Sequence, residues 1–135
     1  MELIAWDPIF SVNVELIDQQ HQMLVQMIND LYDAMVTDKE NDAIGSLIDR
    51  LHTYAAMHFA REEHFFDIFG YPESDVHIKE HKDFEKKIAA FEADFKAGKQ
   101  KLSKDIIKFL SDWLVAHIKG SDKRYGPYLN ERGVK

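Results

Sequence analysis

The chain has 135 residues, which suffices for one domain with a large buried core, and 45% of them are hydrophobic. The absence of cysteine excludes disulfides, thiolate metal sites and cysteine nucleophiles, and a formal net charge of −7 argues against binding to nucleic acid or to anionic lipid. The first residues show no signal-peptide pattern, and no apolar run is long enough to span a membrane, so we expect a single cytoplasmic domain over residues 1–135.

An N-terminal arm and a first helix open the chain. Residues 1–14 show no helical period, but they contain Trp6, Pro8 and Phe10, and we expect the aromatic rings to pack across the rest of the protein. Residues 15–36 then form a helix, because apolar positions recur at alternating spacings of four and three. The inward positions of this helix are Ile17, His21, Leu24, Ile28, Leu31 and Met35.

Three further helices are predicted. The second covers residues 41–69, and its inward positions are Ile44, Ile48, Leu51, Ala55, His58, Glu62, Phe65 and Phe69. The third starts near Ser74 and Asp75, whose oxygens are suited to cap it, and stops at Gly98. The fourth starts near Ser103, and residues 119–135 are predicted to be a polar tail. Short links between the helices favour an all-α, antiparallel up-down-up-down four-helix bundle with an N-terminal arm.

Histidines and a glutamate replace hydrophobic residues along the inward faces of these helices. Two such positions on the second helix lie one turn apart, as do two on the third, and the break at Gly70 brings the pairs face to face. A single buried histidine is more often a hydrogen-bonded core residue than a ligand. The whole set would be costly to desolvate unless something satisfied it, and a pair of metal ions would do so. These candidates are His21, His58, Glu62, His77, His81 and His117.

Other polar residues on the second helix are expected to lie at the surface. His52 and His64 are each six residues from His58, which places them roughly 120° around the helix from it. Glu63 is next to Glu62 and is likewise expected to be solvated.

Asp122 is a further candidate that the spacing alone leaves open. It lies five residues after His117, and an ideal α-helix turns it about 140° away. Gly120, between the two, could permit a wide turn or a π-bulge, a feature that often occurs at functional sites. Otherwise Asp122 is an ordinary surface aspartate.

As a pattern, these residues resemble the ligand set of the hemerythrin family in its stand-alone bacterial form. The matching positions, in type and order, are His21, His58-x-x-x-Glu62, His77-x-x-x-His81 and His117-x-x-x-x-Asp122. The resemblance covers nearly the whole chain and extends to Trp6, Asp18-Gln19-Gln20-His21, Gly70-Tyr71-Pro72 and Trp113-Leu114. It implies a hemerythrin-like bundle that holds a non-haem di-iron centre and binds dioxygen reversibly.

The resemblance also implies a role for each ligand. One iron ion would be bound by His77, His81 and His117. The other would be bound by His21 and His58. The two carboxylates, Glu62 and Asp122, would bridge the irons together with an oxo or hydroxo group. One coordination position would stay open for dioxygen, on the two-histidine iron.

The ligand types separate this chain from another class of di-metal bundle. Ferritin-like proteins use four carboxylates with two Glu-x-x-His motifs, and this chain contains no such motif. The identity of the metal rests on the family, because imidazole and carboxylate would also accept zinc or manganese.

We therefore expect a protein, not an enzyme, that stores, transports or delivers dioxygen. The alternatives are oxygen or redox sensing through a partner, a minor peroxide- or nitric-oxide-consuming activity at the same centre, and a structural zinc bundle. Dioxygen is the expected ligand, nucleic acid and membrane are not expected partners, a protein acceptor of oxygen is unknown, and a monomer is expected.

An apolar pocket beside the open position would slow oxidation of the centre by excluding water. Family members line their oxygen site with apolar side chains, and this chain offers Leu24, Phe59, Trp113, Leu114 and Ile118. Each of these side chains could instead be plain core. Leu24 and Ile118 fit the pocket best, because the helix spacing places them beside ligands.

Overall fold

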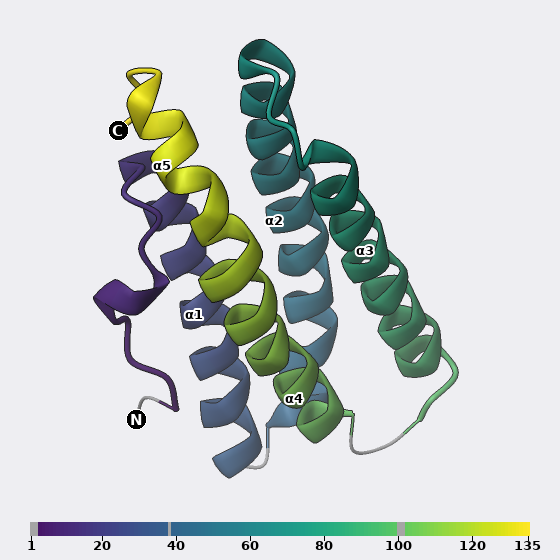
Figure 1. The fold of residues 1–135 in the computed structure, drawn as a ribbon. Coiled ribbons are helices and arrows are strands. Elements are labelled where there is room, and N and C mark those ends of the chain that lie inside the picture. The colour runs from purple at the N-terminus through teal and green to yellow at the C-terminus, as the bar shows by residue number, and fades with distance from the viewer. Residues whose placement is uncertain (1–2, 38, 100–101) are drawn as a thin grey trace.

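Helices make up all the regular structure in the part of the chain that the computed structural model describes, residues 3–37, 39–99 and 102–135. Four long rods lie side by side (Figure 1). They are α1 (Glu15–Val36), α2 (Glu40–Phe69), α3 (Ser74–Lys96) and a fourth rod made of α4 (Ser103–Trp113), the π-helical segment η2 (Leu114–Asp122) and α5 (Lys123–Glu131). Successive rods run in opposite directions, α1 packs on α2 and α4, and α2 packs on α3. This arrangement confirms the predicted antiparallel bundle.

The turn between α2 and α3 places the two rods against each other. Gly70 ends α2 by adopting the left-handed conformation, with φ 62°, which glycine takes at little cost. Helix α3 begins at Ser74 as predicted, but the predicted capping by Ser74 or Asp75 is wrong. Both residues lie in the first turn, Glu73 is the cap residue, and it makes no side-chain capping bond. The Ser74 N–H is bonded to the Tyr71 carbonyl at 3.2 Å, so the turn itself satisfies it.

The fourth rod continues well past its predicted end. In place of a polar tail after residue 119, η2 and α5 carry the helix on to Glu131. Tyr125 and Leu129, one turn apart, are fully buried and hold α5 against the bundle. The prediction is therefore wrong, although Gly126 and Pro127, residue types that often break helices, lie inside α5. Gly126 has a packing reason, since a Cβ there would overlap the Val12 carbonyl oxygen.

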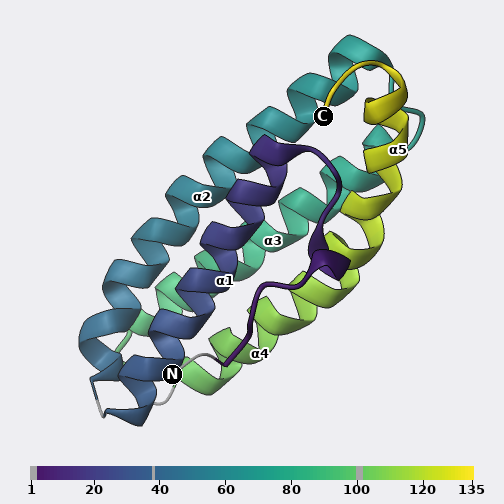
Figure 2. The same ribbon diagram turned by 90° about the vertical axis from the view of Figure 1, so that its left-hand side faces the viewer.

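The N-terminal arm contains a short turn, η1 (Pro8–Phe10), and lies along α1 and the fourth rod (Figure 2). The side chain of Asn29 accepts a backbone N–H at the start of the arm at 2.9 Å. Further along, the Asp18 carboxylate accepts the Val12 N–H at 2.8 Å. Phe10 is buried and Trp6 packs against the main core, which confirms the expected packing of the arm.

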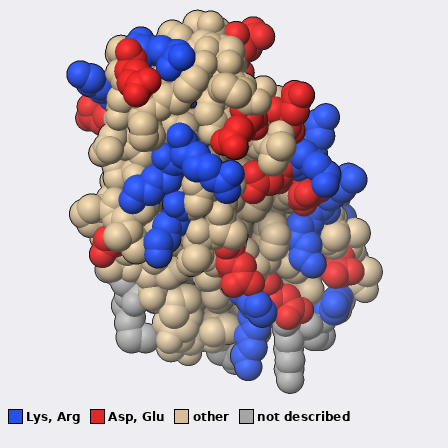
Figure 3. Space-filling model, viewed as in Figure 1, with Lys and Arg blue, Asp and Glu red and all other residues tan. Residues whose placement is uncertain are grey.

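Acidic and basic side chains are both spread over the face of the molecule seen in Figure 3. Exposed ion pairs of this kind add little to stability, so the fold depends on its buried side chains. No helix in the described ranges is long and apolar enough to cross a lipid bilayer.

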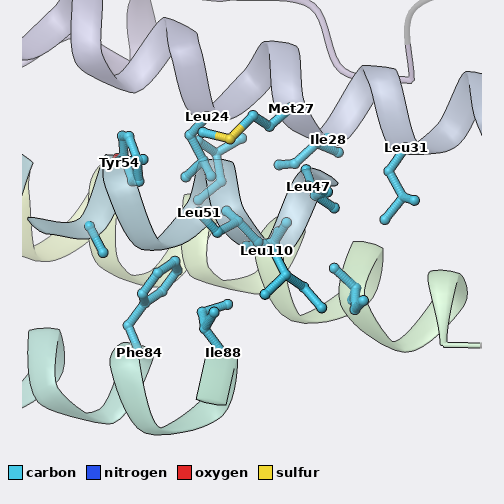
Figure 4. Packing of buried hydrophobic residues seen from close by; sticks show 14 of the residues in the cluster. Leu24, Met27, Ile28, Leu31, Leu47, Leu51, Tyr54, Phe84, Ile88 and Leu110 are labelled. Carbon is cyan, nitrogen blue, oxygen red and sulfur yellow. The ribbon is translucent and has the colours of Figure 1, made fainter. Parts of the chain in front are cut away.

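Apolar side chains pack into two clusters, one toward each end of the bundle. The main cluster lies away from the Gly70 turn and includes Leu24, Ile28, Leu51, Phe84, Ile88 and Leu110 (Figure 4). The smaller cluster includes Val12, Ile17, Phe66, Tyr71, Tyr125 and Leu129. On α1, His21 lies between Ile17 of the smaller cluster and Leu24 of the main one. The inward histidines and carboxylates of the other rods also lie between residues of the two clusters. Apolar side chains therefore cover this polar layer on both sides.

The inward face of α2 departs from the prediction after Glu62. Phe66 is buried, whereas Phe65 and Phe69 are only half-buried. The steps from His58 to Glu62 and from Glu62 to Phe66 are both four residues, so the alternation of fours and threes stops here. A straight helix drifts away from a strict heptad in this way.

Candidate metal centre

Seven ligand-type side chains meet in the buried layer between the two apolar clusters. The α1 helix supplies His21. The α2 helix supplies His58 and Glu62. The α3 helix supplies His77 and His81. The η2 segment supplies His117 and Asp122. None is more than 3% exposed. The structure thus brings together all seven residues that the sequence singles out.

These side chains form two groups that share their carboxylates. The three-histidine group consists of Glu62, His77, His81, His117 and Asp122. The two-histidine group consists of His21, His58, Glu62 and Asp122. Within each group, one potential ligand atom from every residue lies within 4.8 Å of all the others. The arrangement therefore provides two adjacent positions at which a cation could be held.

The carboxylate of Asp122 faces both groups at once. Its Oδ1 lies 2.7 Å from His77 Nε2 and 3.0 Å from His117 Nε2. Its Oδ2 lies 2.9 Å from His21 Nε2. The two oxygens of one side chain are thus divided between the groups, which is the geometry of a bridging ligand.

Glu62 connects the groups less evenly. Its Oε1 lies 3.0 Å from His58 Nε2 and 3.1 Å from His81 Nε2, so one oxygen faces an imidazole of each group. Its Oε2 lies 3.6 Å from His77 Nε2.

The short distances are not accompanied by well-formed hydrogen bonds. All four oxygens of Glu62 and Asp122 are buried without a hydrogen-bond partner of good geometry, and the same holds for Nε2 of the three-histidine group's imidazoles. Buried polar atoms in native proteins are normally satisfied. Because these atoms lie so close together, one cation could contact several of them at once. This donor set, imidazole nitrogen and carboxylate oxygen, fits a pair of transition-metal ions.

The π-helical segment explains how Asp122 reaches the centre. In a π-helix the hydrogen bonds run from residue i to i+5, so residues five apart come onto one face. Segment η2 covers Leu114–Asp122 and includes both His117 and Asp122. The wide turn proposed from the sequence is confirmed. Gly120 is not sterically required for it, because an added Cβ there would meet nothing within 4 Å.

Two of the imidazoles have hydrogen-bond partners on their outer nitrogen, Nδ1. His58 Nδ1 lies 2.6 Å from the side-chain oxygen of Gln20. His81 Nδ1 lies 3.1 Å from a carboxylate oxygen of Glu63. An acceptor at Nδ1 keeps the proton there, which leaves the Nε2 lone pair free for a metal. The expectation that Glu63 is simply solvated is wrong, since its side chain is half-buried against His81.

His117 faces a carboxylate from another rod. Its Nδ1 lies 3.3 Å from an oxygen of Glu80 on α3, although the two atoms do not align as a hydrogen bond. The Ser121 hydroxyl donates to that same Glu80 oxygen at 2.9 Å and so fixes the carboxylate. The two predicted surface histidines behave as expected, because His52 and His64 are both exposed. Residue spacing gives the direction of a side chain but not the reach of a long one, so these outer partners could not be told from solvated residues.

Comparison with known proteins identifies the fold family. A family model described as the hemerythrin HHE cation binding domain matches residues 12–129, a range that contains all seven candidate ligands. The chain belongs to the hemerythrin family.

Individual hemerythrins match over nearly their whole length. A bacteriohemerythrin of Methylococcus capsulatus (strain Bath) is 36% identical over 131 residues, which cover 96% of this chain and 99% of the relative. A myohemerythrin of Theromyzon tessulatum is 32% identical and covers 92% of each chain. A crystal structure of wild-type hemerythrin superposes with a TM-score of 0.79 at 34% identity, covering 93% of this chain and 96% of that one.

The charges in this hemerythrin-family centre call for a cation. Burial and the neighbouring Glu62 carboxylate both act to raise the pKa of Asp122, but the imidazoles of His117 and His21 outweigh them and hold it below its ordinary value. Burial lowers the pKa of His77, but the two carboxylates outweigh it and raise that pKa to about 10. Two buried carboxylates thus stay ionised and draw positive charge to themselves. Bound cations would supply that charge in place of protons.

Two buried tyrosines also border the centre. The Tyr54 ring stacks on His58, with ring centroids 5.1 Å apart, and Tyr125 packs edge-on against Phe66 beside His77. Both hydroxyls are buried without a hydrogen-bond partner. Burial, together with the nearby carboxylates, raises the pKa of both phenols well above its ordinary value, so both remain protonated. The sequence gives no sign of Tyr54, and it assigns Tyr125 to a tail.

The five apolar residues predicted to form an oxygen pocket divide into two kinds. Phe59 stacks on His81 and Trp113 stacks on His117, each with ring centroids 3.9 Å apart. These two rings therefore brace imidazoles of the three-histidine group. The remaining three are fully buried aliphatic side chains of the main cluster, namely Leu24, Leu114 and Ile118.

Proposed function

We propose that this chain binds dioxygen reversibly at a di-iron centre and serves to store, transport or deliver it. The observation that carries the proposal is the division of seven buried side chains into a three-histidine group and a two-histidine group that share both carboxylates. An unequal pair of this kind leaves one of two similar metal ions short of a ligand. Membership in the hemerythrin family supports the choice of iron and dioxygen for this chain.

In this proposal each group of side chains has a separate task. His77, His81 and His117 would hold one iron and His21 and His58 the other, with Glu62 and Asp122 shared. Two ferrous ions would supply the two electrons that reversible dioxygen binding requires. The ligand set has five neutral imidazoles and only two carboxylates, so it stabilises high oxidation states less than a carboxylate-rich set would.

The surroundings of the centre support release of the ligand unchanged. Leu24, Leu114 and Ile118 are fully buried, and we propose that they exclude water from the two-histidine side. Aliphatic side chains supply no proton there. The two tyrosine phenols nearby hold their protons firmly, because burial and the carboxylates raise their pKa. Without a ready proton donor, oxidation of the centre with loss of reduced oxygen is slowed.

The deciding experiment is an oxygen cycle on protein reconstituted with ferrous iron under anaerobic conditions. An absorption band should rise in the visible when oxygen is added and vanish when it is removed, over repeated cycles. His21→Ala should abolish the reversible band, whereas His64→Ala, on an exposed histidine, should leave it intact. Steady consumption of peroxide or nitric oxide without a reversible band would favour an enzyme, and tight zinc binding without any gas response would favour a structural bundle.

A further inference from the structure

A notch opens at the surface between α1 and α2 and reaches toward the centre. We call it the methionine notch. Its walls are Met23, Met27, Thr53, Tyr54 and Met57, and Gln26, Asp49 and Arg50 complete the lining. Its volume is about 420 Å³. The α1 and α2 helices also carry His21 and His58, the two imidazoles of the two-histidine group, so the notch lies on that side of the centre.

The mouth of the methionine notch is apolar and partly exposed. The side chains of Met23 and Met57 are 46% and 43% exposed, although both are large hydrophobic residues. An exposed ion pair lies at the rim, where Arg50 donates to Asp30 at 3.0 Å and Gln26 donates to the same carboxylate at 2.8 Å. Methionine side chains are unbranched and flexible, so they can move aside for a small apolar molecule.

The floor of the methionine notch is a single aromatic ring. Tyr54 is 1% exposed and its ring stacks on His58, with an angle of 13° between the two planes. Figure 4 shows Tyr54 on α2 beside Leu24 and Met27 of the facing helix α1. The Tyr54 hydroxyl has no hydrogen-bond partner. Rotation of this ring would therefore break no hydrogen bond, and the ring lines the notch while it stacks on His58.

We propose that the methionine notch is a binding site for small apolar molecules and the access route by which dioxygen reaches the two-histidine side, with the Tyr54 ring as its gate. The route rests on the proposed function, whereas the binding site does not. Dioxygen is apolar, and an apolar wall concentrates it relative to water. A volume of about 420 Å³ suits a small molecule better than a protein segment.

If the notch is an access route, a substitution that narrows it should affect the kinetics of oxygen binding differently from a substitution of an iron ligand. Narrowing a route slows entrance and exit by the same factor, so the equilibrium affinity for dioxygen does not change. Thr53→Trp and Met23→Trp narrow the mouth from opposite helices. Each should lower both the association and the dissociation rate by about tenfold, one decade being a common scale for such effects. Ile68→Trp is the matched control, because Ile68 is an exposed α2 residue that does not line the notch.

The test combines stopped-flow oxygen binding with xenon-pressurised crystals of the same di-iron protein. Xenon should occupy the methionine notch of wild type and of Ile68→Trp, and it should be displaced in Thr53→Trp. Unchanged rates in both narrowed variants, or a changed affinity with an unchanged dissociation rate, would overturn the route. An empty notch in xenon-treated wild type would overturn the binding site. If wild type shows no reversible oxygen binding, the proposed function fails, and the xenon result still decides the site.

Discussion

The two groups of the centre share both carboxylates but differ in what stands behind their imidazoles. In the three-histidine group, His81 and His117 face the carboxylates of Glu63 and Glu80. In the two-histidine group, His58 faces the neutral side-chain oxygen of Gln20. A carboxylate behind a metal-binding imidazole makes the ring a stronger donor. We therefore expect the three-histidine group to hold its ion more firmly.

The packing around the two groups differs in the same direction. Phe59 and Trp113 stack closely on imidazoles of the three-histidine group, while the ring on His58 is Tyr54, which is also the floor of a surface notch. Aromatic rings stack closely on one half of the centre, whereas the ring on the other half is more distant and also lines a surface notch. A centre built in this way can keep its metal at one position and exchange a ligand at the other.

Loss of a shared ligand should have the largest effect on iron binding, because it weakens both groups at once. Glu62→Ala takes a carboxylate from both, so we expect the iron content of reconstituted protein to fall from two ions per chain to nearly none, measured by elemental analysis. His52→Ala, on an exposed histidine of the same helix, should retain both ions. Two ions bound to Glu62→Ala would show that the carboxylate bridges nothing.

Removing the carboxylate behind an imidazole of the three-histidine group should reduce the difference in iron affinity between the two groups. Glu63→Gln keeps the size of the side chain but takes away its charge, and we expect the more firmly held iron to bind about tenfold more weakly. A chelator titration measures this, since wild type should lose its irons in two separate steps. Asp67→Asn, an exposed acid on the same helix, should preserve both steps. A Glu63→Gln titration that matches wild type would mean that the carboxylate does not strengthen His81.

A polar side chain that admits water to the two-histidine side should make the oxygenated protein oxidise faster. Leu24→Ser and Ile118→Ser each place a hydroxyl in the fully buried aliphatic layer, and we expect oxidation to the inert diferric state to speed up several-fold with both irons still bound. The decay of the oxygenated spectrum at fixed pH is the measurement. Such core changes cost about 3 kcal/mol in stability, so the assay belongs well below the unfolding midpoint. Decay as slow as wild type in both variants would place the dry pocket elsewhere.

The smallest effect is expected at Gly120, within the segment that delivers Asp122. A Cβ there meets nothing within 4 Å, so Gly120→Ala should keep both irons and raise the unfolding free energy by about 0.5–1 kcal/mol through helix propensity. Thermal unfolding and iron content check this together. Loss of iron from Gly120→Ala would show that glycine is needed to form the π-helical turn.

The main features of the bundle follow from the sequence because they depend on periodicity. Helix α1 runs from Glu15 to Val36 as the spacing predicts, and inward polar residues mark the layer in which the seven side chains meet. Asp122 was open to two interpretations because spacing arguments assume α-helical geometry, and only the family resemblance or the π-helical segment itself resolves them.

Features that depend on side-chain reach and packing were not predictable. Glu63 lies off the inward face, yet its long side chain extends to His81. Helix α5 was taken for a polar tail, and it packs closely because Gly126 has no side chain where it meets Val12. The methionine notch arises from how side chains of two helices fail to fill the space between them, which no periodicity encodes.

The central claim is that this chain holds two iron ions in unequal groups that share two carboxylates. Anomalous diffraction from crystals of the iron-loaded protein, recorded on either side of the iron absorption edge, tests it most directly. We predict two iron peaks, one bound by His77, His81 and His117 and one bound by His21 and His58, with Asp122 contacting both. A single peak, or two peaks without a shared carboxylate, would contradict the account.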